Sequence, residues 1–178
     1  DLPCGGLNGD RFHSVAHLAG AGIPYTGSVM AIDPSGRGTD ETAVCIIKML
    51  NGFLYLTAIR AYRDGYSDAT LKDIVKLAKA QQVNHVIIEA NFGDGMFTKL
   101  ISPYFTKDYP CLIEEVKHSK QKEARIVDTL EPVMNQHKLV VDRSVIMWDY
   151  ESTKSLSPEK ALKYQLFYQM SRITRERN

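Results

Sequence analysis

An apolar run that ends in an acid is the feature that most constrains this chain. Residues 29–33 (Val-Met-Ala-Ile-Asp) are followed by a Gly-rich polar turn and then by a second β-branched run, residues 42–47. This pattern predicts a hairpin whose first strand is buried and carries Asp33 at its tip. A later apolar run, residues 85–89, also ends in an acid, Glu89. Two acids at the ends of two buried strands can converge on one point.

Convergent carboxylates attract divalent cations, and a pair of metal ions is the usual means of cutting phosphodiesters. Each acid also has a simpler interpretation. Asp33 could bond the backbone amides of its own turn, and Glu89 could pair with a core Lys or Arg. Because Glu is a poor strand and turn residue, its place after an apolar run needs a reason, and the two acids together favour a metal site.

Two-metal hydrolysis usually needs three or more carboxylates around cations about 3.5–4 Å apart. One cation helps to form the attacking hydroxide, and the other stabilises the leaving oxygen. Asp40, across the hairpin loop, and Asp94, in the loop after Glu89, are further candidate ligands, with turn chemistry as the simpler role for both.

Four basic residues are candidates for contacts with phosphate. Arg37 lies among glycines at the loop tip, where its guanidinium can bind phosphate and the glycines allow close backbone approach. Lys120, Lys122 and Arg125 open a predicted helix, where cations oppose the helix dipole, and this disadvantage favours an anion-facing role. The alternative for each of the four is a solvated surface cation.

Composition limits the class of protein. A chain of 178 residues with 44% apolar and 24% charged residues is expected to form one soluble domain. Its formal net charge is +1, so any DNA-binding surface must be a local basic patch. The three cysteines are widely spaced and form no CxxC pair, which argues against structural zinc and favours reduced thiols. No apolar run is long enough to span a membrane.

The periodicity of the chain predicts its organisation. Residues 1–27 lack a clear period and are expected to form a linker or arm. Antiparallel strands are predicted over residues 28–33, 42–50 and 53–62, with an Asn51-Gly52 turn between the last two. Strands and helices then alternate, and this order predicts a mixed α/β sheet with helices on both faces.

The later elements are expected at the following places. A helix capped by Ser67 or Asp68 is followed by a strand ending at Glu89 and by a helix from about 95 to 101 that stops near Pro103. Next come a strand over 111–116, a helix after Ser119 that Pro132 kinks or divides, and a short strand over 139–141. The last helix starts at Ser157-Pro158 and has one apolar stripe through Leu162, Leu166, Met170 and Ile173.

Three spaced motifs resemble a known family. Residues 30–41 (MAIDPSGRGTDE), 86–95 (VIIEANFGDG) and 120–126 (KQKEARI) are similar to the nuclease domain of phage terminase large subunits, in particular the short-tailed podovirus type. Residues 168–177 also fit that type. The resemblance covers nearly the whole chain, and the occurrence of three motifs in order makes it specific.

The resemblance implies a fold, a reaction and a set of site residues. The fold is RNase H-like over residues 28–178, a mixed sheet of an antiparallel three-strand meander plus parallel strands. The implied reaction is cleavage of concatemeric double-stranded DNA with two Mg²⁺ or Mn²⁺ ions during genome packaging. Asp33 and Glu89 match the family's first two catalytic acids, and Asp40 matches an additional one. The third family acid is expected beyond Asn178, with Asp149 as a weaker substitute within the chain.

The family also implies partners and a location. The partners are double-stranded DNA, an ATPase domain of the same subunit, the portal protein and the small terminase subunit, in the cytoplasm of the host cell and without a membrane. This sequence contains no G-x-x-x-x-G-K-[ST] motif, so no P-loop ATPase is expected in it, and residues 1–27 are expected to be an arm from the ATPase domain.

Two other classes remain open at this point. Nucleotide-binding domains of the actin or hexokinase type also combine an Asp with a Gly-rich hairpin, there to hold ATP phosphates. A non-catalytic docking module for the portal or motor is the second. ATP binding without DNA cleavage would favour the first, and partner binding unaffected by Asp33→Asn would favour the second.

Overall fold

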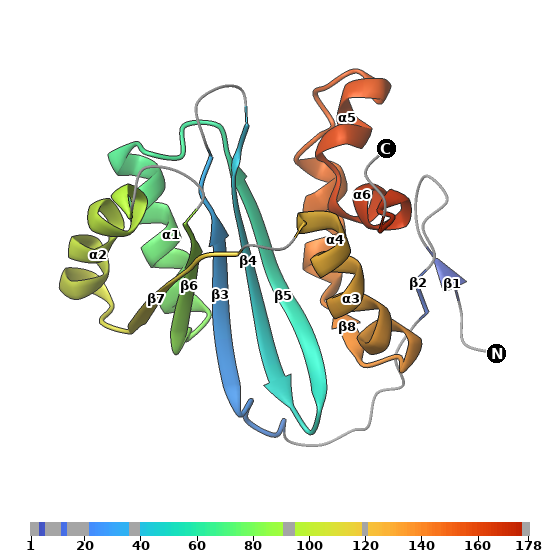
Figure 1. Cartoon of the computed structure of the whole chain (residues 1–178), viewed down its shortest axis with the longest axis horizontal. Helices are drawn as coiled ribbons and strands as arrows, with labels where there is room; N and C mark the ends of the chain where they lie inside the picture. Colours follow the sequence, from blue (N-terminus) through green and yellow to red (C-terminus); the bar gives the residue numbers. More distant parts are fainter. Residues whose placement is uncertain are drawn as a thin grey trace.

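A six-stranded mixed sheet forms the centre of the protein (Figure 1). The computed structural model describes residues 4–5, 12–13, 22–35, 40–90, 95–118 and 121–175. The strands are β3 (Gly27–Asp33), β4 (Thr42–Leu50), β5 (Phe53–Tyr62), β6 (His85–Glu89), β7 (Leu112–Val116) and β8 (Leu139–Val141), in the spatial order β7-β6-β3-β4-β5-β8. Within this sheet β4 is antiparallel to both of its neighbours, and the other pairs are parallel. The predicted mixed sheet is confirmed.

Helices cover both faces of the sheet, as predicted. They are α1 (Asp68–Ala80), α2 (Met96–Asp108), α3 (Lys122–Asn135), α4 (Arg143–Glu151), α5 (Pro158–Tyr164) and α6 (Leu166–Arg172). In Figure 1, α1 and α2 lie on one side of the strands and α3 to α6 on the other. A separate antiparallel pair, β1 (Cys4–Gly5) and β2 (Phe12–His13), is the described part of the expected N-terminal arm before residue 22. No helix in the described ranges is long and apolar enough to cross a membrane.

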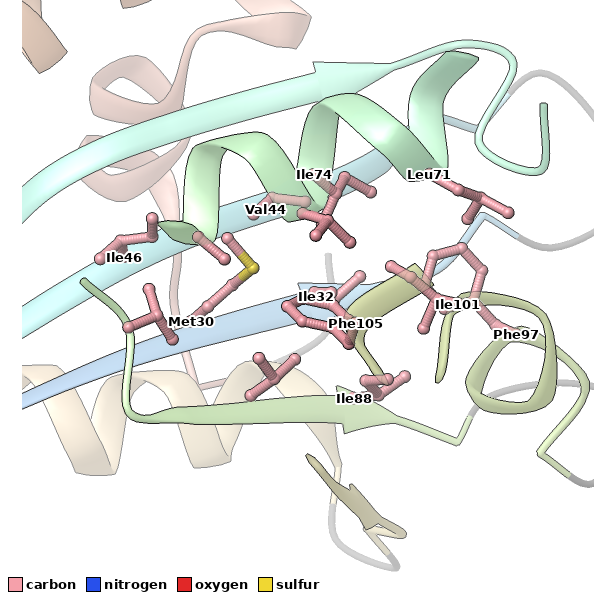
Figure 2. Close-up of a cluster of buried hydrophobic side chains, with 14 of the residues drawn as sticks. Met30, Ile32, Val44, Ile46, Leu71, Ile74, Ile88, Phe97, Ile101 and Phe105 are labelled. Carbon is pink, nitrogen blue, oxygen red and sulfur yellow. The ribbon is translucent and has the colours of Figure 1, made fainter. Parts of the chain in front are cut away.

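The larger core lies between the sheet and the α1–α2 pair (Figure 2). Leu71, Ile74, Val75 and Ala78 of α1 recur at helical spacing, and all four are buried. Ser67 caps this helix by accepting a hydrogen bond from the Thr70 backbone N–H. The strands and α2 supply the rest of this core, with Met30, Ile32, Val44, Ile46, Val86, Ile88, Phe97, Ile101 and Phe105.

A second, smaller core lies on the opposite face. Side chains alternate along a strand, so Val44 and Ile46 of β4 enter the first core while Cys45 and Ile47 face the second. There α4 and α6 pack against β5 through Val145 and Phe167. In contrast, α3 places no fully buried side chain in either core.

Neither of the two prolines inside helices ends its helix, so the predicted stop near Pro103 was wrong, and α3 is not divided at Pro132. Pro103 lies within α2, which continues to Asp108, and Pro132 lies within α3, which continues to Asn135. A proline removes one backbone hydrogen bond and costs roughly 3 kcal/mol in a helix interior. In α2, Phe97, Ile101 and Phe105 are buried on both sides of Pro103. We attribute the continuity of α2 to the burial of these three side chains, which exceeds that cost.

The C-terminal helices also differ from the prediction. The sequence reading missed α4, which Asp142 caps by accepting a hydrogen bond from Ser144 N at 2.7 Å. The single last helix that was predicted is two helices, α5 and α6, separated at Gln165, whose backbone is extended. Asp149 of α4 is buried and accepts hydrogen bonds from the backbone N–H groups of Leu166 and Phe167 at 2.7 and 3.1 Å. This carboxylate caps α6, which explains why a new helix starts there.

Truncation of Ile74 is expected to lower the free energy of unfolding by about 2–5 kcal/mol. The side chain is fully buried in the larger core, and its removal leaves a cavity. Urea denaturation followed by circular dichroism measures the change for Ile74→Ala. The exposed Lys76→Ala, on the same helix, should change stability by no more than about 0.5 kcal/mol, and equal effects would contradict this core assignment.

Asp149→Asn is expected to lower stability by about 1–3 kcal/mol, because one of the two α6 amides then faces an N–H₂ group instead of an oxygen. The same denaturation assay applies. Glu151→Gln, at an exposed position of the same helix, is the matched control and should be within about 0.5 kcal/mol of the wild type. A stability of Asp149→Asn equal to that of the wild type would refute the capping role.

Candidate functional site

Asp33 and Glu89 lie side by side at one edge of the sheet. Strands β3 and β6 are parallel neighbours, and Ile32 is paired with Ile88, so the acids that follow these residues end their strands at the same level. Ile32 and Ile88 are buried in the larger core. Because side chains alternate, Asp33 and Glu89 project from the opposite face of the sheet.

Two cations from α3 contact these acids. Lys122 Nζ lies 2.5 Å from Asp33 Oδ2 and 3.9 Å from Glu89 Oε2. Arg125 Nη2 lies 2.9 Å from Glu89 Oε1. Lys122 and Arg125 are three residues apart and therefore share one face of the helix. These four side chains, which we call the charge cluster, carry two negative and two positive charges.

The charge cluster is more enclosed at one end than at the other. The Arg125 and Glu89 side chains are 22% and 17% exposed, whereas those of Lys122 and Asp33 are 52% and 36% exposed. Partial burial acts to lower the pKa of Lys122, but its hydrogen bond to Asp33 and the charges of Asp33 and Glu89 outweigh this and raise the pKa. Lys122 therefore remains a cation at neutral pH.

The surface beside Asp33 is open. Ala43 of β4 is paired with Asp33 on one side and with Ala61 of β5 on the other, and both alanines are exposed. Ala31, two residues before Asp33, is exposed as well. Small side chains thus leave this part of the sheet accessible to a large ligand.

The structure gives less information about the other predicted site residues. Asp40 is exposed and precedes β4. Arg37, Asp94 and Lys120 lie outside the described residues. Asp149, the weaker candidate for a third acid, directs both of its oxygens at the amides of α6. Within the described ranges, no group of three or more His, Cys, Asp or Glu side chains is spaced to hold a metal ion.

The sequence reading missed a buried polar network at the base of the loop that follows Asp33. The backbone N–H of Ser35 donates to Thr42 Oγ1 at 2.9 Å, and the Tyr66 hydroxyl donates to the Ser35 carbonyl at 3.0 Å. A Cβ at Gly65 would lie 1.9 Å from Thr42 Oγ1, so only glycine fits there. Gly65 and Tyr66 follow β5, and in the sequence this segment is typical only of a turn.

The acids of the charge cluster are chemically suited to a divalent cation. Carboxylate oxygens are the ligands that Mg²⁺ and Mn²⁺ prefer, and Mg²⁺ is commonly held by one or two carboxylates together with water and substrate phosphate. The Lys122 ammonium already lies between Asp33 Oδ2 and Glu89 Oε2, so this location accepts positive charge. Asp33 and Glu89 fit one cation, and a second would need further ligands.

Comparisons with known proteins identify the family of this chain. The family model described as "Terminase Bacteriophage T7, Ribonuclease H-like domain" matches residues 32–139. The large terminase subunit of Enterobacteria phage T3 is 42% identical over 177 residues, which is 99% of this chain and 30% of that protein. The chain therefore spans less than a third of the length of this relative.

Solved structures of terminase nucleases share the fold. The manganese-soaked, inhibitor-bound terminase nuclease domain of human cytomegalovirus has a TM-score of 0.59 at 11% identity, covering 85% of this chain and 75% of that one. The nuclease domain of large terminase subunit gp2 from bacterial virus Sf6 has a TM-score of 0.59 at 14% identity, covering 88% and 75%. These similarities show a ribonuclease H-like fold, and with the family match the chain belongs to the T7 terminase ribonuclease H-like domain family.

Proposed function

We propose that this chain is a metal-dependent endonuclease domain of a phage terminase large subunit, which cuts concatemeric double-stranded DNA during genome packaging. The observation that carries the proposal is the pairing of Asp33 and Glu89 at the ends of neighbouring parallel strands, on an open face of the sheet. The names of the two similar structures support it, since both are terminase nuclease domains and the cytomegalovirus one was soaked with manganese.

Asp33 and Glu89 would hold Mg²⁺ or Mn²⁺ on this proposal, with Asp40 as an additional ligand from the loop. A divalent cation in this place supplies Lewis-acid chemistry and lowers the pKa of bound water. The two-ion mechanism of the family needs at least one more carboxylate, which we propose lies outside the described residues.

Lys122 is the described residue best placed to bind a DNA phosphate. Its side chain is half exposed and can turn from Asp33 toward a ligand on the open face. Arg37 and Lys120 remain proposed phosphate contacts. Because contacts to phosphate carry no direct base information, cleavage should be largely independent of sequence.

The proposed partners are those of a whole terminase large subunit. They are an ATPase domain of the same subunit, the portal protein and the small terminase subunit, in the host cytoplasm.

Loss of either acid should abolish cutting. Asp33→Asn and Glu89→Gln each remove one anionic ligand of the proposed cation. Loss of a group that only orients a metal ligand costs roughly 10–100-fold, so we expect each of these variants to reduce Mn²⁺-dependent nicking of supercoiled plasmid by more than that. The assay compares both variants with the wild-type chain, with and without a chelator. If the chain alone does not cut, Mn²⁺ binding measured by calorimetry serves as the readout.

The control for this experiment is Asp108→Asn, at an exposed position near the end of α2. It should cut as the wild type does. Equal chelator-sensitive cleavage by all variants would refute the assignment of the acids. Binding of ATP without any cleavage would instead favour the nucleotide-binding alternative, and binding of portal protein unaffected by Asp33→Asn, without cleavage, would favour a docking module.

Lys122→Gln should weaken DNA binding and make it less sensitive to salt. If Lys122 neutralises one phosphate, the slope of log affinity against log salt should become shallower by about 1. Fluorescence anisotropy with a labelled duplex in Ca²⁺ measures this slope. Lys76→Gln, exposed on α1 across the sheet, should leave the slope unchanged, and an unchanged slope for Lys122→Gln would exclude it as a phosphate contact.

A further inference from the structure

We propose that Arg125 is a positioning residue, which fixes the Glu89 carboxylate in the orientation that binds a cation, and is not a DNA contact. From the sequence alone, Arg125 is a candidate phosphate contact. The inference rests on the proposed function, because it concerns the same cation site and deepens it.

The two oxygens of Glu89 have different neighbours. Oε1 accepts a hydrogen bond from Arg125 Nη2 at 2.9 Å. Oε2 faces the Lys122 ammonium at 3.9 Å, and this ammonium also contacts Asp33 Oδ2. Arg125 thus holds one oxygen from the side of α3, while the other oxygen lies near the ammonium that contacts Asp33.

Burial makes the contact between Arg125 and Glu89 the firmer of the two α3 contacts. Its side chains are 22% and 17% exposed, against 52% and 36% for Lys122 and Asp33, so it is screened less by solvent. A charge-assisted hydrogen bond in such surroundings is about twice as strong as a neutral one. Arg125 Nε is also enclosed and has no hydrogen-bond partner among the described residues, so this edge of the guanidinium faces protein and not solvent.

An alternative explanation is that Arg125 only attaches α3 to the sheet. This helix contributes no fully buried side chain, so ion pairs matter for its attachment. The chain offers a matched control in Arg175, which contacts Asp128 at 3.2 Å and Glu131 at 2.9 Å on the same helix. A role limited to holding α3 predicts similar consequences for loss of Arg125 and loss of Arg175.

The test is Mn²⁺ affinity measured by isothermal titration calorimetry, with thermal unfolding in chelator as the measure of folding. Arg125→Gln should weaken Mn²⁺ binding by roughly 10–100-fold, the usual cost of losing a group that orients a metal ligand. Arg125→Lys, which keeps a donor and the charge, should recover part of the loss. Arg175→Gln should bind Mn²⁺ as the wild type does, whatever its melting temperature.

A double-mutant cycle tests whether Arg125 affects Mn²⁺ affinity through Glu89 or through another group. In the Glu89→Gln background, Arg125→Gln should cause no further loss of Mn²⁺ affinity, because the group it orients is no longer a carboxylate. Three results would each overturn the proposal. The losses of Mn²⁺ affinity could be additive in the double mutant, Arg125→Gln could bind Mn²⁺ as the wild type does, or Arg175→Gln could lose as much Mn²⁺ affinity as Arg125→Gln. If neither Asp33→Asn nor Glu89→Gln alters Mn²⁺ affinity, the proposed cation site itself fails, which is a separate result.

Discussion

The repulsion between two neighbouring carboxylates is the constraint on which the rest of the site depends. The register of β3 and β6 fixes Asp33 and Glu89 side by side, whatever their charge. Lys122 Nζ lies 2.5 Å from Asp33 Oδ2 and 3.9 Å from Glu89 Oε2, so the two carboxylates are close together. Two unit charges about 5 Å apart repel by about 3 kcal/mol at an effective dielectric constant of about 20. Lys122 and Arg125 offset this repulsion, and they come from α3, a helix with no fully buried side chain. The acids therefore help to hold α3 against the sheet.

Local pattern was enough to predict most of the sheet and its main helix. Strands β4 and β5 have the predicted bounds, and α1 begins at Asp68 as its cap indicates. The errors occur where contacts between residues far apart in the sequence determine the bounds of a helix. Pro103 is tolerated because α2 buries side chains on both sides of it, and the break at Gln165 exists because Asp149, on another helix, caps α6. Propensity along the chain carries no information on either contact.

In the candidate site, too, the sequence predicts some features and not others. Asp33 and Glu89 could be found because each ends an apolar run, and parallel strands bring such ends together. Their partners could not, because Lys122 is 89 residues from Asp33 and Arg125 is 36 residues from Glu89 along the chain. The basic start of the helix singled out Lys122 and Arg125 but gave only a general expectation of anion binding, whereas in the structure these side chains pair with Asp33 and Glu89.

The charge balance of the cluster connects its stability to its proposed chemistry. With Lys122 in place the four side chains are neutral in sum. If Lys122 turns away and Asp33 and Glu89 hold a divalent cation instead, the four side chains and the cation together would carry a charge of +2, and each phosphate of a bound DNA backbone would offset one unit. Lys122, on its half-exposed side chain, could then pair with one of these phosphates. Arg125, enclosed against Glu89, has no comparable freedom. Of the two cations on this helix face, Lys122 would therefore move to contact DNA, and Arg125 would stay fixed on Glu89.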